Sequence, residues 1–132
     1  MGGIVAHVGF PTTPGGNPTH ESLNDHTYCC QASADMCDSG EPPIEKMDQC
    51  KAFHAKKVNV RAEDAKRFNV PLVYSEFGAC SNTLVCFHEI TAAADAFDDH
   101  LASWMYWMFK GFGDFTTTGS LTEGYYDGAG NL

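Results

Sequence analysis

Basic residues are scarce in this sequence, which has 8 Lys and Arg against 17 Asp and Glu and a formal net charge of −9. Such a chain repels a phosphate backbone and an anionic membrane surface, which excludes nucleic acid as an expected partner. No run approaches the roughly 20 consecutive apolar residues of a membrane span. The opening MGGIVAHVGFP also lacks the basic and long apolar segments of a signal peptide. We therefore expect neither a membrane span nor a targeting address in these residues.

The usual metal-ligand spacings are missing as well, because the sequence contains no C-x-x-C and no H-x-x-x-H. We therefore predict no metal and no cofactor. Six cysteines in polar surroundings instead indicate disulfides, and with them a secreted or lysosomal location. Sequence alone does not choose among the 15 pairings that six cysteines allow. The easiest closures to form are Cys80 with Cys86, and Cys37 with Cys29, Cys30 or Cys50.

Strand-like and helix-like segments alternate along the 132 residues. Strands are predicted at 4–8, around 24–30, at 70–77 and at 103–109, the last so apolar that both of its faces should be covered. A helix is predicted from Ile44, with Met47, Cys50 and Phe53 on the same face, and a separate helical turn at 63–68. A further helix carries a stripe of core residues at Ile90, Ala93, Ala94, Phe97 and Leu101. This order is typical of βα units, so we predict an α/β fold with a parallel sheet.

The stretch VPLVYSEFGAC ends an apolar, strand-like run on a carboxylate, Glu76. Gly78 follows two residues later and allows the chain to turn away, which leaves Glu76 at the carboxyl end of the strand. In TIM barrels that end of the sheet carries the active site. The alternative is a glutamate at the end of a strand that simply contacts water.

Other groups suited to sugar chemistry fall at the ends of neighbouring predicted strands. His26 and Tyr28 follow one strand, and Trp107 lies in another. Retaining glycosidases need an ionised carboxylate as nucleophile and a second carboxyl group about 5 to 5.5 Å away. Phenol and imidazole groups can hydrogen-bond such a carboxylate and keep it charged, and an indole can stack on a sugar ring. Trp104 competes with Trp107 for the stacking role, because alternation sends the two to opposite faces.

In this order and spacing, the motifs resemble glycoside hydrolase family 5, and within it the endoglycoceramidase-like branch. There H-x-Y ends the sixth barrel strand, the nucleophile ends the seventh in EFG, and a tryptophan ends the eighth. The resemblance implies that His26 and Tyr28 are catalytic residues, that Glu76 is the nucleophile and that Trp107 binds substrate. GFPTTPGG, SWMYWMFKGF and TTTGSLTEGYYDGAGNL also fit this branch, so the resemblance spans about 4–132.

The resemblance implies that residues 1–132 are the carboxyl-terminal half of a (β/α)8 TIM-barrel domain, roughly strands 5 to 8. Lys110, three residues after Trp107, is a second candidate for substrate binding, with a solvated loop charge as the alternative. The N-E-P motif that carries the acid/base glutamate after the fourth strand does not occur here. We therefore expect activity to require a separate amino-terminal half-barrel.

The predicted function is that of a retaining glycosidase fragment that hydrolyses the O-glycosidic bonds of β-linked glycans or glycolipids. Its expected partner is the carbohydrate or glycolipid substrate. Two alternatives remain open: a non-catalytic, truncated remnant, and a disulfide-stabilised secreted binding domain. The second alternative fits the cysteine content, but such scaffolds are usually shorter and richer in loops than this chain.

Overall fold

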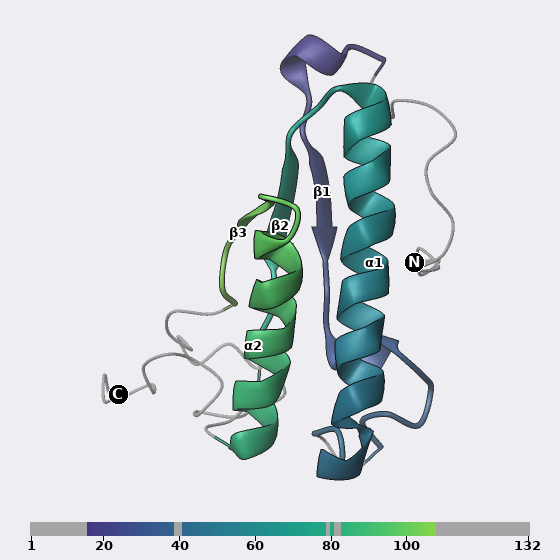
Figure 1. Cartoon of the computed structure of the whole chain (residues 1–132), viewed down its shortest axis with the longest axis vertical. Coiled ribbons are helices and arrows are strands. Elements are labelled where there is room, and N and C mark those ends of the chain that lie inside the picture. Colours follow the sequence, from purple (N-terminus) through teal and green to yellow (C-terminus); the bar gives the residue numbers. More distant parts are fainter. Residues whose placement is uncertain (1–15, 39–40, 79, 81–82, 108–132) are drawn as a thin grey trace.

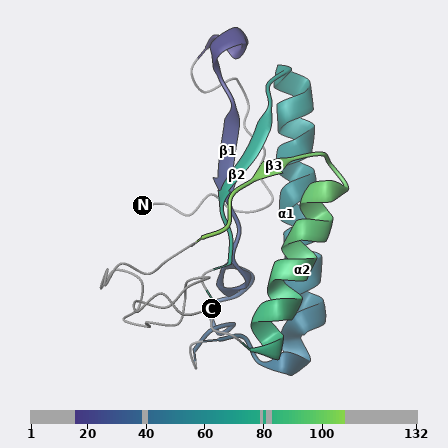
Figure 2. The ribbon, with the colours of Figure 1, turned by 90° about the vertical axis from the view of Figure 1, so that its left-hand side faces the viewer.

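A computed structural model describes residues 16–38, 41–78, 80 and 83–107 of the protein. Three strands form one parallel sheet in chain order: β1 (Leu23–His26), β2 (Leu72–Glu76) and β3 (Ser103–Trp104). Helix α1 (Met47–Phe68) connects β1 to β2, and helix α2 (Leu84–Asp98) connects β2 to β3. Both helices cover the same face of the sheet (Figures 1 and 2).

This arrangement consists of two successive βα units, as expected for parallel strands joined by helical crossovers. Three strands are too few to separate part of a (β/α)8 barrel from an open α/β sheet, so the partial barrel stays a prediction. The predicted strand at 4–8 lies outside the described residues. Three short 3-10 helices complete the described elements: η1 (Pro18–His20), η2 (Cys29–Gln31) and η3 (Ile44–Lys46).

Aromatic rings and small residues form the core between the sheet and α2. Tyr74 and Phe77 of the β2 segment pack their rings against Phe97, and all three are almost completely buried. Ala93 and Ala96 let the helix approach the sheet closely. The prediction that Leu101 belongs to this buried stripe is wrong: α2 ends at Asp98, and Leu101 is 95% exposed.

Helix α1 is one continuous element, not a helix near Ile44 and a separate turn at 63–68. Residues 44–46 form η3, and Ile44 is exposed. The buried face of the helix includes Lys57, Arg61 and Asp64, so the apolar pattern breaks although the helix continues. Charged residues on a buried face hide the helical period from a search for apolar spacing.

Asp25 of β1 supplies the counter-charge for this buried face. Its carboxylate lies 2.7 Å from Arg61 Nε and 3.6 Å from Lys57 Nζ. Lys57 Nζ also donates to the His26 carbonyl and to Gln31 Oε1. The network therefore fixes the end of β1 to α1 by hydrogen-bonded ion pairs.

The segment after α2 differs from the prediction of a strand covered on both faces. Within the described residues, Trp104, Met105 and Trp107 are 47%, 57% and 36% exposed. Of the described residues after α2, Ser103 and Trp104 pair with β2 as a strand, and Trp107 adds an isolated bridge to Gly78. Both faces of this segment therefore present apolar side chains to solvent.

All six cysteines form disulfides: Cys29–Cys50, Cys30–Cys37 and Cys80–Cys86. These three bonds fit an extracellular or secreted protein. Cys29–Cys50 joins the segment after β1 to α1, whereas the other two close short loops. In the part of the chain that the structure describes, neither helix is long and apolar enough to cross a membrane.

Replacing Arg61 by methionine should lower the free energy of unfolding by about 3–5 kcal/mol, because it leaves the Asp25 carboxylate buried without its closest cation. Arg67→Met is the matched control, since Arg67 pairs with Asp64 but its side chain is 47% exposed. That change should cost less than about 1 kcal/mol. Urea unfolding of both variants measures the difference, and equal losses would contradict the assigned role of Arg61.

Candidate active site

The carboxyl ends of the three parallel strands lie at one edge of the sheet (Figure 1). His26 is the last residue of β1, and Glu76 is the last residue of β2. The two residues are register partners across the strands. Parallel pairing thus brings together side chains that are 50 positions apart in the sequence.

A bulge in β2 sets the direction of the Glu76 side chain. Asp25 pairs with Tyr74 and His26 with Glu76, so Ser75 is an extra residue on β2. Strict alternation after the buried Tyr74 would send Glu76 toward the helices. The extra residue changes that direction: Ser75 Oγ and Glu76 Oε2 both contact the His26 ring. The bulge therefore places the carboxylate on the same side as the imidazole.

Two rings hold one oxygen of the Glu76 carboxylate. Tyr28 donates its hydroxyl hydrogen to Oε2 over 3.0 Å, and His26 Nδ1 lies 3.2 Å from the same atom. The other imidazole nitrogen, Nε2, lies 3.0 Å from Ser75 Oγ, which fixes the plane of the ring. The Glu76 side chain is 30% exposed, so it remains accessible. Two contacts on one oxygen fix the orientation of the carboxylate, as a nucleophile requires.

Trp107 lies at the same edge of the sheet, one strand further on. Its backbone N–H donates to the Phe77 carbonyl over 2.8 Å, next to Glu76. Trp104 and Tyr106 both contact the Phe77 ring, which packs against α2. Alternation then places Trp107 on the opposite face, the face of the candidate site. Lys110, the other expected substrate contact, lies outside the described residues.

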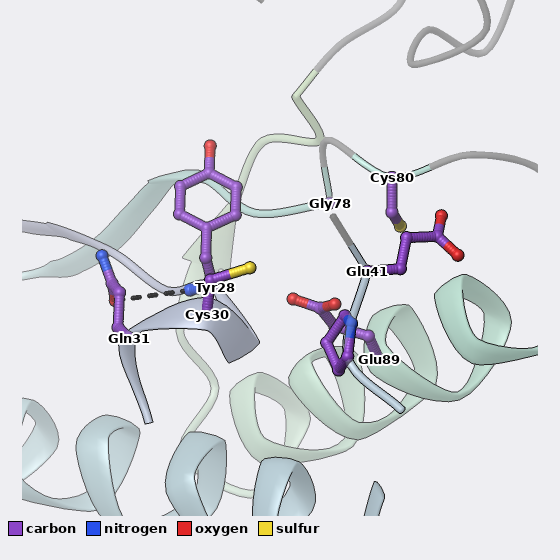
Figure 3. A pocket seen from close by; sticks show the side chains of 8 residues that line it. Tyr28, Cys30, Gln31, Glu41, Gly78, Cys80 and Glu89 are labelled. Carbon is purple, nitrogen blue, oxygen red and sulfur yellow. Dashed lines mark hydrogen bonds between the residues drawn. The ribbon is translucent and has the colours of Figure 1, made fainter. Parts of the chain in front are cut away.

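A pocket of roughly 300 Å³ borders this group of residues, with Tyr28 in its wall. Its lining residues are Tyr28, Cys30, Gln31, Glu41, Pro42, Gly78, Cys80 and Glu89. Figure 3 shows the Glu89 carboxyl pointing from α2 toward the segment of Tyr28 and Cys30. The pocket therefore contains a carboxyl group from a helix as well as groups from the strand ends.

Two buried titratable groups lie behind the site and were not predicted from the sequence. His54 of α1 has a completely buried side chain, and burial lowers its pKa to about 4. Glu89 of α2 is 4% exposed, and burial raises the pKa of its carboxyl to about 7. The Glu41 carboxylate raises it further, whereas a hydrogen bond from the Cys29 N–H lowers it. Both side chains are therefore uncharged over a range of mildly acidic pH.

The sequence contained a signal for both groups. His54 lies four residues after Cys50 and four before Val58, and both of these neighbours are buried. Glu89 lies between Cys86 and Ala93 on the buried face of α2. A titratable residue at such an apolar helical position is a candidate for a buried functional group.

Among the described residues, one group has donor atoms close enough together for a metal ion: Cys29, Cys50 and Glu89, within 4.8 Å of one another. The two cysteines are joined in a disulfide, so neither supplies a thiolate.

Comparison with known protein families, with curated proteins and with solved structures finds no match for this chain. The assignment of the site therefore depends on its own geometry.

Gly78→Ala should destabilise the protein and displace the segment that carries Trp107. Gly78 has a φ of +102°, and a Cβ there would lie 2.8 Å from the Trp107 carbonyl oxygen and collide with the Tyr106 ring. Gly16→Ala is the matched control, because Gly16 also has a positive φ, of +79°, but no atom within 4 Å of an added Cβ. The control should cost about 1 kcal/mol, and Gly78→Ala clearly more in urea unfolding. Equal costs would argue against the close approach at Gly78.

The pKa shifts of Glu89 and His54 predict opposite effects of pH on stability. Between pH 4.5 and about 7, Glu89 keeps its proton in the folded chain but loses it in the unfolded chain, so the free energy of unfolding falls as pH rises through that range. Between pH 6.5 and about 4, His54 stays neutral in the folded chain but is protonated in the unfolded chain, so the free energy of unfolding falls as pH falls. Each effect amounts to about 3 kcal/mol, and the two cancel where their ranges overlap.

Unfolding measured from pH 4 to 8 in Glu89→Gln and His54→Gln separates the two contributions. Relative to wild type, Glu89→Gln should become more stable as pH rises toward 7, and His54→Gln more stable as pH falls toward 4. Parallel pH profiles for wild type and both variants would contradict the assigned protonation states.

Proposed function

We propose that the protein takes part in retaining hydrolysis of β-linked glycans or glycolipids, with Glu76 as the nucleophile. The observation that carries this proposal is the Glu76 carboxylate at the end of β2, with its Oε2 held by Tyr28 and beside His26. A carboxylate that is ionised, oriented and accessible is what attack on an anomeric carbon requires.

In this proposal the two oxygens of Glu76 have different roles. Tyr28 and His26 both contact Oε2. None of the described residues hydrogen-bonds the other oxygen, Oε1. Oε1 is then the atom that forms the bond to the anomeric carbon while the bond from that carbon to the leaving oxygen breaks. Water later attacks the same carbon, and the Glu76 carboxylate leaves. Trp107 provides an apolar face for the sugar ring at the adjacent strand.

The second carboxyl group of the reaction is supplied by a separate half-barrel in this proposal. General acid and base catalysis contributes typically 100- to 10,000-fold, so the chain alone should hydrolyse ordinary glycosides very slowly. A substrate whose leaving group needs no proton avoids this requirement. The half-reaction of Glu76 can therefore be tested in this chain by itself.

A 2-deoxy-2-fluoro glycoside with a dinitrophenolate leaving group should label the chain on Glu76, as read by intact mass and peptide mapping. Glu76→Gln should abolish the labelling. Tyr28→Phe should slow it roughly 10- to 100-fold, because the carboxylate loses a charge-assisted hydrogen bond. Tyr74→Phe is the control, since that hydroxyl is buried on the helix side and should not affect the rate. Labelling of any other residue, or undiminished labelling of Glu76→Gln, would reject Glu76 as the nucleophile.

A non-catalytic binding domain is the second candidate, favoured by the exposed aromatic rings of Trp104 and Trp107 and by the three disulfides of the chain. Binding by stacking does not require a carboxylate nucleophile. This function predicts that Trp107→Ala removes glycan binding in calorimetry, whereas Glu76→Gln retains it and wild type is never labelled. Labelling of wild type on Glu76 would exclude it as the sole function.

A further inference from the structure

From His26, the last residue of β1, onward, the chain sends alternate side chains to opposite sides. His26 and Tyr28 point toward Glu76, whereas Thr27 and Cys29 are completely buried. Whatever holds Thr27 and Cys29 therefore also determines where His26 and Tyr28 lie. The position of two rings against Glu76 depends on contacts made on the other side of the segment.

Each of the two helices contributes one titratable side chain to those contacts, and α1 also holds Cys29 through the disulfide to Cys50. From α1, His54 Nδ1 lies 2.8 Å from Thr27 Oγ1. From α2, Glu89 Oε1 accepts a hydrogen bond of 2.7 Å from the Cys29 N–H. All of these side chains are at most 5% exposed, so water does not compete for the contacts. Thr27 and Cys29 flank Tyr28, and each is held by a titratable residue.

The two titratable residues also face each other. His54 Nε2 lies 3.9 Å from Glu89 Oε1, and within the described residues this buried nitrogen has no hydrogen-bond partner. A buried polar atom without a partner is costly, which favours a small shift that closes the gap. Closing it would join Thr27, His54, Glu89 and Cys29 in one continuous chain of hydrogen bonds.

Two arrangements of donors and acceptors are possible in this chain of hydrogen bonds. With Glu89 ionised, Thr27 donates to Nδ1 and the Nε2–H of His54 donates to Glu89. When Glu89 takes a proton from solvent, its O–H donates to Nε2 and the Nδ1–H donates to Thr27. The imidazole stays neutral in both states and only its tautomer changes, in accord with the lowered pKa of His54.

Other charged and titratable groups near the pair favour its neutral forms. Lys57 of α1 lies near His54 and disfavours an imidazolium, and Glu41, in the loop before α1, disfavours ionised Glu89. Tyr106, after β3, is a further titratable group near Glu89; burial and, after it, the Glu89 charge raise the pKa of that phenol. Protonation of Glu89 is therefore the event that reverses the donors and acceptors in this chain of hydrogen bonds near neutral pH.

We propose that His54 and Glu89 are positioning residues for the Glu76 site, and that protonation of Glu89 is transmitted through His54 to Thr27 and so to the Tyr28–Glu76 hydrogen bond. The effect of this coupling on catalysis rests on the proposed glycosidase function. The coupling between Glu89 protonation and the Tyr28 position does not rest on it, and it is tested without any substrate.

NMR of the full chain with carbon-13 in the tyrosine rings measures this link. The Tyr28 signal is the one that disappears in Tyr28→Phe. Because the His26 ring contacts the same Glu76 oxygen as Tyr28, the titration is followed in a His26→Gln background. The Tyr28 shift should there show an inflection near pH 7, where Glu89 titrates, and the inflection should be lost when Glu89→Gln is added. Glu41→Gln in the same background is the matched control, because it removes another titratable group near the site but should retain the inflection. No inflection in His26→Gln, or one that persists after Glu89→Gln is added, would overturn the proposal.

A second measurement covers the case in which Glu89→Gln does not fold. Carbon-13 in the glutamate carboxyls reports the titration of Glu89 directly, as the carboxyl that titrates near pH 7. Linkage is reciprocal, so Tyr28→Phe should move that midpoint by roughly 0.5 unit. An unchanged midpoint would overturn the proposal. If the link is present but fluoroglycoside never labels Glu76, the glycosidase function fails and the positioning pair stands.

Discussion

The hydrogen bond from the Tyr28 hydroxyl to Glu76 Oε2 is the interaction on which the candidate site depends. It joins the segment after β1 to the end of β2, and it exists because parallel pairing puts both strand ends at one edge of the sheet. The bulge at Ser75 turns Glu76 toward this phenol and away from the helices. A local irregularity in the backbone therefore decides whether the carboxylate faces solvent or the protein core.

Much of the surrounding structure holds the phenol in place. Lys57 binds the His26 carbonyl, and the disulfide Cys29–Cys50 ties the next turn of chain to α1. The core beneath, built on Tyr74, Phe77 and Phe97, keeps β2 and α2 in register with these contacts. A rigid frame of this kind suits a site in which a carboxylate must be oriented before the substrate arrives.

Part of this arrangement could be predicted from the sequence. The run around Tyr74 and the stripe around Phe97 predict β2 and α2, because apolar residues follow the period of each element there. The prediction did not recover α1 as one helix, since Arg61 and its neighbours put charge on its buried face and their partner, Asp25, lies in a distant strand. Leu101 continued the helical spacing but falls beyond the helix end, which a period alone does not locate.

The candidate site, too, could be predicted from the sequence only in part. Motif order singled out His26, Tyr28 and Glu76, and the structure places the Tyr28 hydroxyl and His26 Nδ1 at 3.0 and 3.2 Å from Glu76 Oε2. Neither the bulge nor the approach of His54 to Glu89 follows from sequence spacing, since both depend on tertiary packing.

A crystal structure that resolves individual side-chain atoms tests the central claim most directly. The account predicts the Tyr28 hydroxyl and the His26 ring within hydrogen-bond distance of one Glu76 oxygen, and a Glu76 side chain turned toward α1 and α2 would contradict it.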